Sequence, residues 1–393
     1  MAVKPKLCMI PSGYKGGASS GDLYSVLPSD GVGDFDFSRS GSATRINKDG
    51  LIETVASNVP RLNYPLIDGV VSGCPSLLLE PESANLLPYS EDFTQWTNIG
   101  SPTVELNNII SPNGTLNGTK VTRGTNTTLF RQITSPIIGI EHTFSIYAKK
   151  GNYDKLTLDI GDEIAPTFTL TDEWQRFEVT STPSINHVDI SLPLSSSGDF
   201  IYIYGAMLES GSFPTSYIPT SGSQATRSAE TCNNAGDANT FNDSEGVLFG
   251  EVNFLSPSDT SLLEINDGSA NNRVSIYSDS GVLSVNAFNG ASNTLTSPST
   301  DILNYNKVVI SYKLNEVKMY VNGILIGTNN VFSGFSASLS NMETSLSWGA
   351  IPFYGNTKQI QYFDTALTDT DLEELTSWTS FSEMARGQLY SIQ

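Results

Sequence analysis

The sequence predicts an all-β protein with two tandem antiparallel β-sandwiches, which follow an extended N-terminal arm and precede one short C-terminal helix. Three observations predict this class. Apolar and polar residues alternate over many short segments, as in strands that bury one face. Glycine, asparagine and aspartate separate these segments, as tight turns require. Finally, Thr368 precedes a run of acidic residues within 369–374, which is the pattern of a capped helix start.

Chain length and composition support the same class. A chain of 393 residues has room for two or three domains with substantial cores. The hydrophobic content of 38% is too high for a disordered chain. Only 16% of the residues are charged, and serine, threonine, asparagine and glycine are abundant, which suits a β protein with hydroxyl-rich faces and many turns.

The clearest strands lie towards the C-terminus. Residues 307–314 and 317–321 alternate between apolar and polar side chains, and Asn322-Gly323 follows them. Asn-Gly between alternating runs is a strong hairpin signal, because both turn positions need a positive φ. The order of motifs resembles that of the laminin-G-like, concanavalin-type jelly roll, and the motifs are Gly246–Phe254, Leu262–Gly268, Val317–Gly323 and Gln361–Asp369. The resemblance implies a jelly roll at 231–378, followed by a tail at 379–393.

The middle of the chain, residues 81–230, predicts the first sandwich. Its alternating runs cover 142–148, 155–160, 174–180, 187–192 and 200–208. Strands at this spacing, with turn residues between them, are typical of antiparallel sandwiches. The segments 174–177 and 204–209 resemble those of jelly-roll carbohydrate-binding modules, which implies that the two sandwiches are similar in build.

The first eighty residues differ from the rest. Residues 11–34 are rich in glycine, serine, aspartate and proline without periodicity, which predicts an extended segment that needs a partner surface for order. Four strings resemble those of bacteriophage virion proteins, namely DFDFSRSGSATRINKDGLIE, NVPRLNY, PSLLLEPESANLLPYSEDFTQW and SFPTSYIPTSGSQATRSAE. In that family the strings link a particle-proximal segment to carbohydrate-binding-like jelly rolls of tail fibres, head fibres and other appendages. The resemblance implies a structural or adhesive virion role, with residues 1–80 anchoring the chain to other virion proteins, and supplies no catalytic residues.

Charge and cysteine content exclude several classes. Lysine and arginine number 21 against 41 aspartates and glutamates, and this net charge of −20 without a basic cluster argues against direct nucleic-acid binding. Cys8, Cys74 and Cys232 are too few and too far apart for a disulfide scaffold. The sequence contains no signal peptide or membrane span. Together with the role that the virion resemblance implies, this leads us to expect a virion surface protein that is made in the host cytoplasm.

The sequence predicts no catalytic residues. His142 and His187 lie inside predicted strands without a triad or zinc motif, which indicates structural roles. Glycoside hydrolysis needs two facing carboxylates, and the Glu-x-Asp-x-x-Glu pattern of concanavalin-type hydrolases is missing. The nearest candidates are Glu251, Glu264, Asp267, Asp159, Asp162 and Glu163. Loop and edge carboxylates are usually only solvated, so we expect no enzyme, with a glycan depolymerase as the alternative.

Glycan binding without catalysis needs aromatic rings that stack on sugar faces, polar groups for hydroxyls and, in some sites, a calcium ion that braces loops. The candidate binding residues are Trp348, Phe353, Tyr354, Asn356, Asp267, Asn271 and Arg273. The first four would form a platform, which the last three would extend from a loop. Burial in the core also explains Trp348 and Phe353, and turn chemistry also explains the loop residues. Apart from such a calcium ion, we predict no cofactor.

These observations predict a non-enzymatic virion appendage that displays two sandwiches to a host-surface glycan or to neighbouring virion proteins. A purely structural decoration or adaptor protein is a further alternative. Weak single-site sugar contacts gain from multivalency, so we expect a homo-oligomer, and fibre-like appendages suggest a trimer. The sequence does not choose between tail, capsid and collar, and it does not name the glycan.

Overall fold

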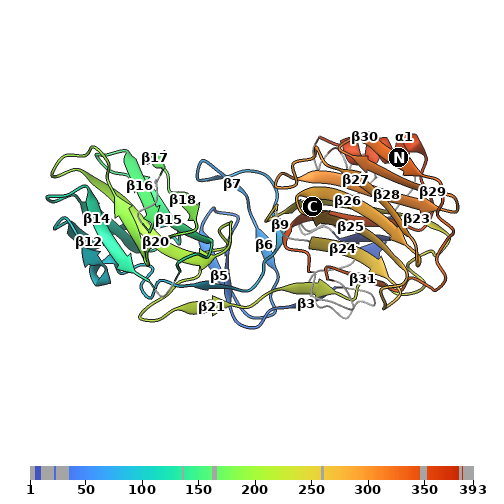
Figure 1. The fold of residues 1–393 in the computed structure, drawn as a ribbon, viewed down its shortest axis with the longest axis horizontal. Coiled ribbons are helices and arrows are strands. Elements are labelled where there is room, and N and C mark those ends of the chain that lie inside the picture. Colours follow the sequence, from blue (N-terminus) through green and yellow to red (C-terminus); the bar gives the residue numbers. More distant parts are fainter. Residues whose placement is uncertain are drawn as a thin grey trace.

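The computed structural model describes residues 5–9, 22–23, 35–134, 137–161, 166–257, 261–345, 352–379 and 383. Two β-sandwiches lie end to end, with short strands and hairpins between them (Figure 1). The predicted all-β class with two antiparallel sandwiches and one short C-terminal helix is confirmed. Within the described residues, no helix is both long and apolar enough to cross a membrane.

The first sandwich packs two five-stranded antiparallel sheets against each other. The strands are β11 (Thr97–Asn98), β12 (Thr103–Ile110), β13 (Leu116–Thr122), β14 (Thr128–Ile133), β15 (His142–Lys150), β16 (Lys155–Ile160), β17 (Thr167–Thr169), β18 (Gln175–Ser181), β19 (His187–Ser191) and β20 (Phe200–Ser210). The sheet orders are β11-β14-β19-β16-β17 and β12-β13-β20-β15-β18. Alternate residues such as Leu156, Leu158 and Ile160 of β16 face the shared core, so the period-2 pattern of the sequence decides which face is buried.

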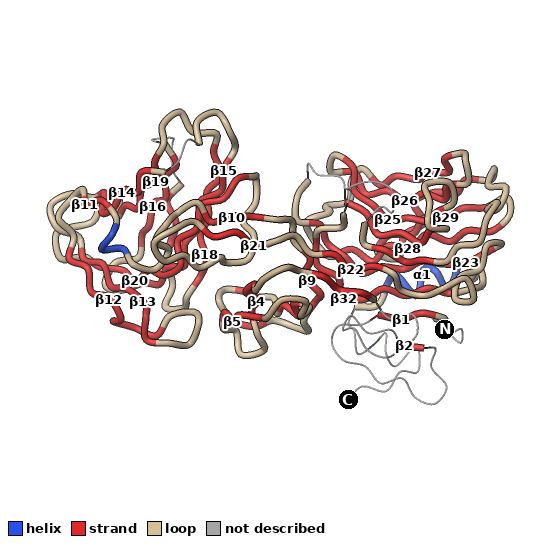
Figure 2. The backbone as a smooth tube through the Cα atoms, turned by 90° about the horizontal axis from the view of Figure 1, so that it is seen from below, coloured by secondary structure: helices blue, strands red, loops and turns tan. Residues whose placement is uncertain are grey.

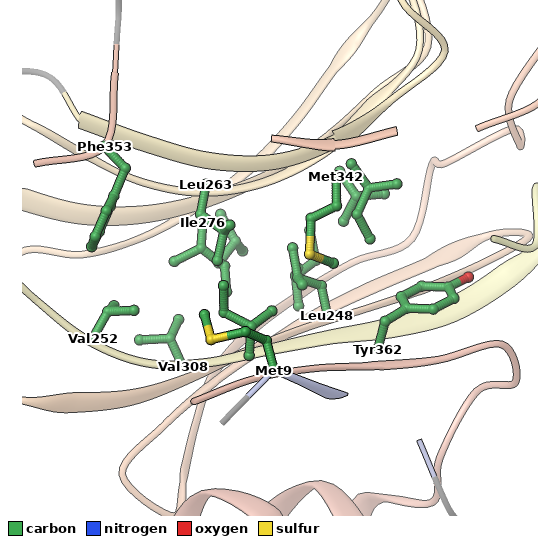
Figure 3. Packing of buried hydrophobic residues seen from close by; sticks show 14 of the residues in the cluster. Met9, Leu248, Val252, Leu263, Ile276, Val308, Met342, Phe353 and Tyr362 are labelled. Atoms are coloured by element: carbon green, nitrogen blue, oxygen red, sulfur yellow. The ribbon is translucent and has the colours of Figure 1, made fainter. Parts of the chain in front are cut away.

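The second sandwich packs a nine-stranded sheet against a five-stranded sheet. The large sheet contains β1 (Leu7–Met9), β2 (Asp22–Leu23), β6 (Arg61–Asn63), β9 (Ser76–Leu79), β23 (Glu245–Phe254), β28 (Asn306–Lys313), β29 (Glu316–Val321), β30 (Ile324–Asn329) and β32 (Gly355–Phe363). The small sheet contains β24 (Ser261–Asn266), β25 (Arg273–Asp279), β26 (Val282–Phe288), β27 (Ser292–Ser297) and β31 (Asn341–Glu343). Figure 3 shows side chains of the two sheets, among them Leu248, Val308, Leu263 and Ile276, packed between them.

The predicted hairpin and helix are both present. Asn322 and Gly323 have φ angles of 50° and 83° and join β29 to β30. Helix α1 (Asp369–Ser377) begins after Thr368, whose Oγ1 accepts a hydrogen bond from the Asp371 amide at 3.2 Å. Leu372 and Leu375 of the helix belong to one buried cluster with Phe249 and Phe363, so α1 covers the outer face of the large sheet.

A connector joins the sandwiches, and it consists of residues 36–85 and 214–233. It contains the strand pairs β3 (Asp36–Ser38) with β22 (Thr231–Asn233), β4 (Ala43–Ile46) with β5 (Ile52–Val55), β7 (Leu66–Ile67) with β8 (Val70–Val71), and β10 (Ser83–Asn85) with β21 (Ala225–Arg227). The hairpin β4–β5 lies between the two sandwiches in both views (Figures 1 and 2). The connector thus brings the N-terminal region and the segment after the first sandwich together.

The described part of the N-terminal region is packed, although the sequence predicted an extended arm there. Strands β1, β6 and β9 belong to the large sheet. Phe35, Phe37, Leu77 and Leu79 are buried in the core of the second sandwich, because their alternation supplies apolar side chains that this core needs. The predicted extended segment 11–34 lies outside the described residues except for 22–23. The predicted division into 1–80, 81–230, 231–378 and 379–393 and the anchoring role of residues 1–80 stay predictions.

Five buried charged residues of the connector form one continuous ionic chain. The order of contacts is Arg39, Glu230, Arg61, Glu80 and Arg227, with 2.7 Å between Arg39 and Glu230, between Arg61 and Glu80, and between Arg227 and Glu80. Each of the five is at most 3% exposed. Burial alone would raise the pKa of Glu80, but Arg227 and Arg61 outweigh it and lower that pKa to about 2. Glu80 is therefore ionised in the folded protein at neutral pH.

We predict that Glu230→Gln destabilises the protein by about 3–5 kcal/mol, because it leaves Arg39 and Arg61 buried without their shared carboxylate. The matched control is Glu53→Gln in the Arg45–Glu53 pair, whose side chains are 24% and 43% exposed and whose loss should cost below about 1 kcal/mol. Urea unfolding of both variants measures the difference. Equal effects of the two substitutions would contradict a stabilising role of the chain.

Acid should weaken the fold in a defined window. The folded-state pKa of Glu80 is about 2, below its ordinary value of 4.5, so its contribution is present above pH 4.5 and is lost as the pH falls towards 2. The loss should be on the order of 3 kcal/mol. Urea unfolding at pH 6, 4 and 3 tests this expectation. Glu80→Gln should remove that part of the pH dependence. If the free energy of unfolding of the variant falls with pH as steeply as that of the parent, the role of Glu80 is refuted.

Candidate binding site at the junction of the two sandwiches

A cavity of about 220 Å³ lies where the connector meets both sandwiches. The lining residues are Thr44, Arg45, Ile46, Ile52, Asn63, Leu78, Glu80, Tyr147, Arg176, Pro214, Thr215, Ser216, Tyr217, Leu255 and Asn356. They come from the hairpin β4–β5, from β15 and β18 of the first sandwich, and from β9 and β32 of the second. The cavity therefore exists only if both sandwiches keep their relative position.

Two amide side chains offer hydrogen-bond donors at this cavity. The Oδ1 of Asn63 accepts a bond from the Ile46 amide at 2.8 Å, and the Oδ1 of Asn356 accepts one from Ser76 Oγ at 3.1 Å. Both Oδ1 atoms are thus occupied, which fixes the orientation of the two amides. Among the contacts of the described residues, neither Nδ2 donates to a protein acceptor, so both remain available to a ligand.

Arg176 brings a positive charge to the cavity. Its Nη1 donates to the Thr215 carbonyl at 2.6 Å and its Nη2 to Ser145 Oγ at 2.8 Å. The Nε atom is buried without a hydrogen-bond partner. Buried polar atoms in folded proteins almost always have a partner, so this orphaned Nε leaves the guanidinium incompletely satisfied by the protein.

Tyrosine rings form one wall. Tyr147 and Tyr217 line the cavity and lie 6.3 Å apart, centroid to centroid. The Tyr217 hydroxyl contacts Ser90 Oγ at 2.7 Å and donates to Glu91 Oε1 at 2.9 Å. These two hydrogen bonds fix the orientation of the Tyr217 ring. Burial, reinforced by Glu91, raises the pKa of Tyr217 well above its ordinary value. The rings are therefore neutral and fixed.

Of the predicted platform residues, the structure places Asn356 at the cavity and Phe353 elsewhere. Phe353 is buried in the core of the second sandwich, 5.5 Å from Phe254 centroid to centroid (Figure 3). Tyr354 is half-buried, and burial raises the pKa of its phenol. Trp348 lies outside the described residues, so the question of its burial stays open.

The predicted loop residues lie apart from Asn356. Asp267 accepts hydrogen bonds from Ser269 Oγ at 2.7 Å and from Asn272 Nδ2 at 2.7 Å, which are turn contacts. The Asn271 amide donates to Ser269 Oγ, and the Asn271 side chain is exposed. The Arg273 guanidinium lies 4.2 Å above the Phe288 ring, and it donates to the Ala270 carbonyl.

Strand pairing shows how far the loop is from the platform. Asn266, just before the loop, pairs with Asn341 at one end of β31, whereas Phe353 donates its amide hydrogen to the Thr344 carbonyl beyond the other end. Asn341 and Thr344 are three residues apart along the chain, which corresponds to roughly 10 Å in an extended strand. The structure therefore does not bring the two predicted groups together.

Two carboxylate clusters lie outside the cavity. Glu264 and Glu343 are directly opposite each other on β24 and β31, and Asn266 Nδ2 donates to both carboxylates, at 2.8 and 3.3 Å. Their neighbours Leu263 and Ile265 face the core, so the pair faces away from it. Burial raises the pKa of Glu343.

Among the other candidate carboxylates, Glu251 accepts a bond from Gln359 at 2.8 Å, whereas Asp162 and Glu163 lie outside the described residues.

The second cluster comprises Asp159, His187 and Asp189, whose potential metal-ligand atoms lie within 4.8 Å of one another. However, Arg131 donates to both oxygens of Asp189, from Nε at 2.8 Å and from Nη2 at 2.6 Å. A metal ion would have to displace this bidentate pair. The geometry thus favours charge pairing between side chains of the neighbouring strands β14, β19 and β16 over a metal site. The predicted calcium ion stays a prediction without assigned ligands.

Sequence reasoning missed most of the cavity. Asn63 and Arg176 lie in segments singled out for other reasons, in the string NVPRLNY and in the predicted strand 174–177. The sequence carries no signal that these segments meet, because their contact depends on how the connector folds.

Comparisons with known proteins identify no family. The chain matches no family model, and no curated protein sequence matches it significantly. Among solved structures, the CBM40 of the Ruminococcus gnavus IT-sialidase is 19% identical, with 35% of this chain and 84% of that chain covered at a TM-score of 0.31. Domain 4 of the arabinanase AbnA from Geobacillus stearothermophilus is 16% identical, with coverages of 42% and 82% and a TM-score of 0.31. Likenesses this distant assign no function to the chain.

We predict that Phe353→Ala lowers the free energy of unfolding by about 3–5 kcal/mol, because it empties a core position between the sheets. Asn271→Ala, at an exposed loop position, should change it by less than about 0.5 kcal/mol. Thermal and urea unfolding measure both. A Phe353→Ala protein that unfolds like the parent would restore Phe353 as an exposed platform residue.

Proposed function

We propose that this chain is a non-catalytic saccharide-binding protein that holds a sugar residue in the junction cavity. The observation that carries the proposal is the convergence of two free amide donors, the Arg176 guanidinium and two tyrosine rings on one opening. Sugars offer hydroxyl acceptors around apolar C–H faces, and this combination of groups suits both. The volume of 220 Å³ is below the roughly 300–1,000 Å³ of sites for drug-sized ligands, so one ring is the fitting occupant.

The chemistry of the cavity supports binding rather than hydrolysis. Glycoside hydrolysis needs two carboxylates, one of which must carry a proton near neutral pH. Glu80 is the single carboxylate among the lining residues, and Arg227 and Arg61 hold its pKa at about 2. It therefore has neither a carboxylate partner in the cavity nor a proton to give.

The alternative function, a glycan depolymerase, has one observation in its favour. Glu264 and Glu343 are adjacent and face away from the core, and burial raises the pKa of Glu343. Release of reducing sugar from host polysaccharide, abolished by Glu343→Gln, would support this alternative. Binding without release would support the proposed function.

We further propose that the protein is a virion appendage, and this part rests on the resemblance of the four strings to phage virion proteins. The proposal includes attachment through residues 1–80, a location on the virion surface and a trimeric assembly. Immunogold labelling of purified particles and light scattering of the isolated protein test location and oligomeric state. Unlabelled particles or a monomer at micromolar concentration would remove the corresponding part.

The direct test of the binding site is substitution of its free donors. Asn63→Ala should weaken binding of the preferred monosaccharide by about five- to tenfold, since one hydrogen bond contributes about 1 kcal/mol. Asn271→Ala is the matched control and should leave binding unchanged. Titration calorimetry with sugars chosen from a glycan array measures both. Equal affinity of Asn63→Ala and the parent would contradict the assignment of the site.

A further inference from the structure

We propose that the junction cavity selects acidic saccharides and seats their carboxylate against Arg176; this inference rests on the proposed function. The selection of an acidic sugar depends on the local charge of the cavity. The protein as a whole carries a net charge of −20, which repels anions, so a preference for an acidic sugar requires a local excess of positive charge.

Arg176 supplies a positive charge without a carboxylate partner. Across the part of the chain that the structure describes, no carboxylate oxygen forms an ion pair with its guanidinium, which instead contacts a carbonyl, a hydroxyl and the Met207 sulfur. Its Nε is buried and has no partner. Arg176 as a whole is half-buried and lines the cavity. A ligand carboxylate beside its guanidinium would supply the counter-charge that the protein does not place there in an ion pair.

The ionic chain next to the cavity does not cancel this charge. It contains three arginines, Arg39, Arg61 and Arg227, and two glutamates, Glu80 and Glu230, so it is itself positive by one charge. Glu80 lines the cavity but is bound by Arg61 and Arg227. The cavity therefore borders a positive cluster.

Two further acidic groups lie near Arg176. Glu209 is fully buried, and its oxygens accept bonds from Ser83 and Thr215, so its acceptors are occupied. Glu178 follows on β18 at an exposed position. Desolvation raises the pKa of Glu209 and of Glu178, and the Arg176 charge acts against it at both, but neither carboxylate is ion-paired to the guanidinium. Arg45, which also lines the cavity, is bound to Glu53 at 2.9 Å in a pair that is partly exposed. None of these groups supplies the partner that Arg176 lacks.

The geometry also explains why a carboxylate on a sugar ring fits better than a free anion. Asn63 and Asn356 offer amide donors to ring hydroxyls, and Arg176 of β18 lines the same cavity. A ligand that uses all three needs an acidic group and hydroxyls on one frame. A sugar acid has this combination.

The test compares D-glucuronate with D-glucose by titration calorimetry or saturation-transfer NMR. In the parent, glucuronate should bind at least tenfold more tightly, and the preference should fall as NaCl is raised from 50 to 500 mM. Arg176→Gln should abolish the preference, and Arg176→Lys should retain part of it. The control is Arg123→Gln, an arginine of the same sandwich that also donates to backbone carbonyls, and it should keep the preference.

The outcomes separate the two proposals. Equal binding of glucose and glucuronate would overturn the charge inference and leave the saccharide site in place. A preference that survives in a folded Arg176→Gln protein would overturn the role of Arg176. Absence of binding for both sugars and for a glycan array would overturn the proposed function itself.

Discussion

The chain of five buried charges in the connector is the interaction on which the remaining architecture depends. Each sandwich has an apolar core of its own, but the segment between them is built largely around Arg39, Glu230, Arg61, Glu80 and Arg227. Buried ion pairs cost much desolvation energy, so such a chain stabilises little compared with apolar packing. What it does supply is specificity, because each charge accepts only the arrangement that pairs it. We take this as the reason that the two sandwiches meet in one geometry.

The same chain shapes the candidate site. Ser216 donates its hydroxyl to Glu80 at 2.7 Å and accepts from Arg61 at 2.6 Å, and both Ser216 and Glu80 line the cavity. Glu80 of the ionic chain and its hydrogen-bond partner Ser216 thus form part of the cavity wall. A ligand there would contact the first sandwich through Arg176 and the second sandwich through Asn63 of β6 and Asn356 of β32. Binding and the relative position of the sandwiches are therefore coupled.

The sequence could predict the elements whose signal is local. The alternation in 307–321, the Asn322-Gly323 turn and the Thr368 cap each depend on neighbouring residues, and all three are present in the structure. The packing of residues 35–80 could not be predicted in the same way. Phe35 and Phe37 form a short alternating pattern, which does not indicate that their partners lie 200 residues later in the second core.

The four virion-like strings show the same limit for the site. Each contributes at least one member of the ionic chain: Arg39, Arg61 and Glu80 come from the first three, and Arg227 and Glu230 from the fourth. The strings contain all five charged residues, but the resemblance gave no indication that these side chains pair with one another. Long-range charge pairing leaves no periodic pattern, so only the folded connector reveals it.

The most direct test of this account is the distance between the two sandwiches in solution. Spin labels at Leu116 and Ile324, which are 59% and 64% exposed on strands of different sandwiches, report it by electron–electron double resonance, after the exposed Cys74 is replaced by serine. If the buried charges fix the joint, the parent gives one narrow distance distribution and Glu230→Gln gives a broad one, with both sandwiches still folded. A broad distribution in the parent, or an unchanged narrow one in the variant, would contradict the claim that the buried charges fix the joint.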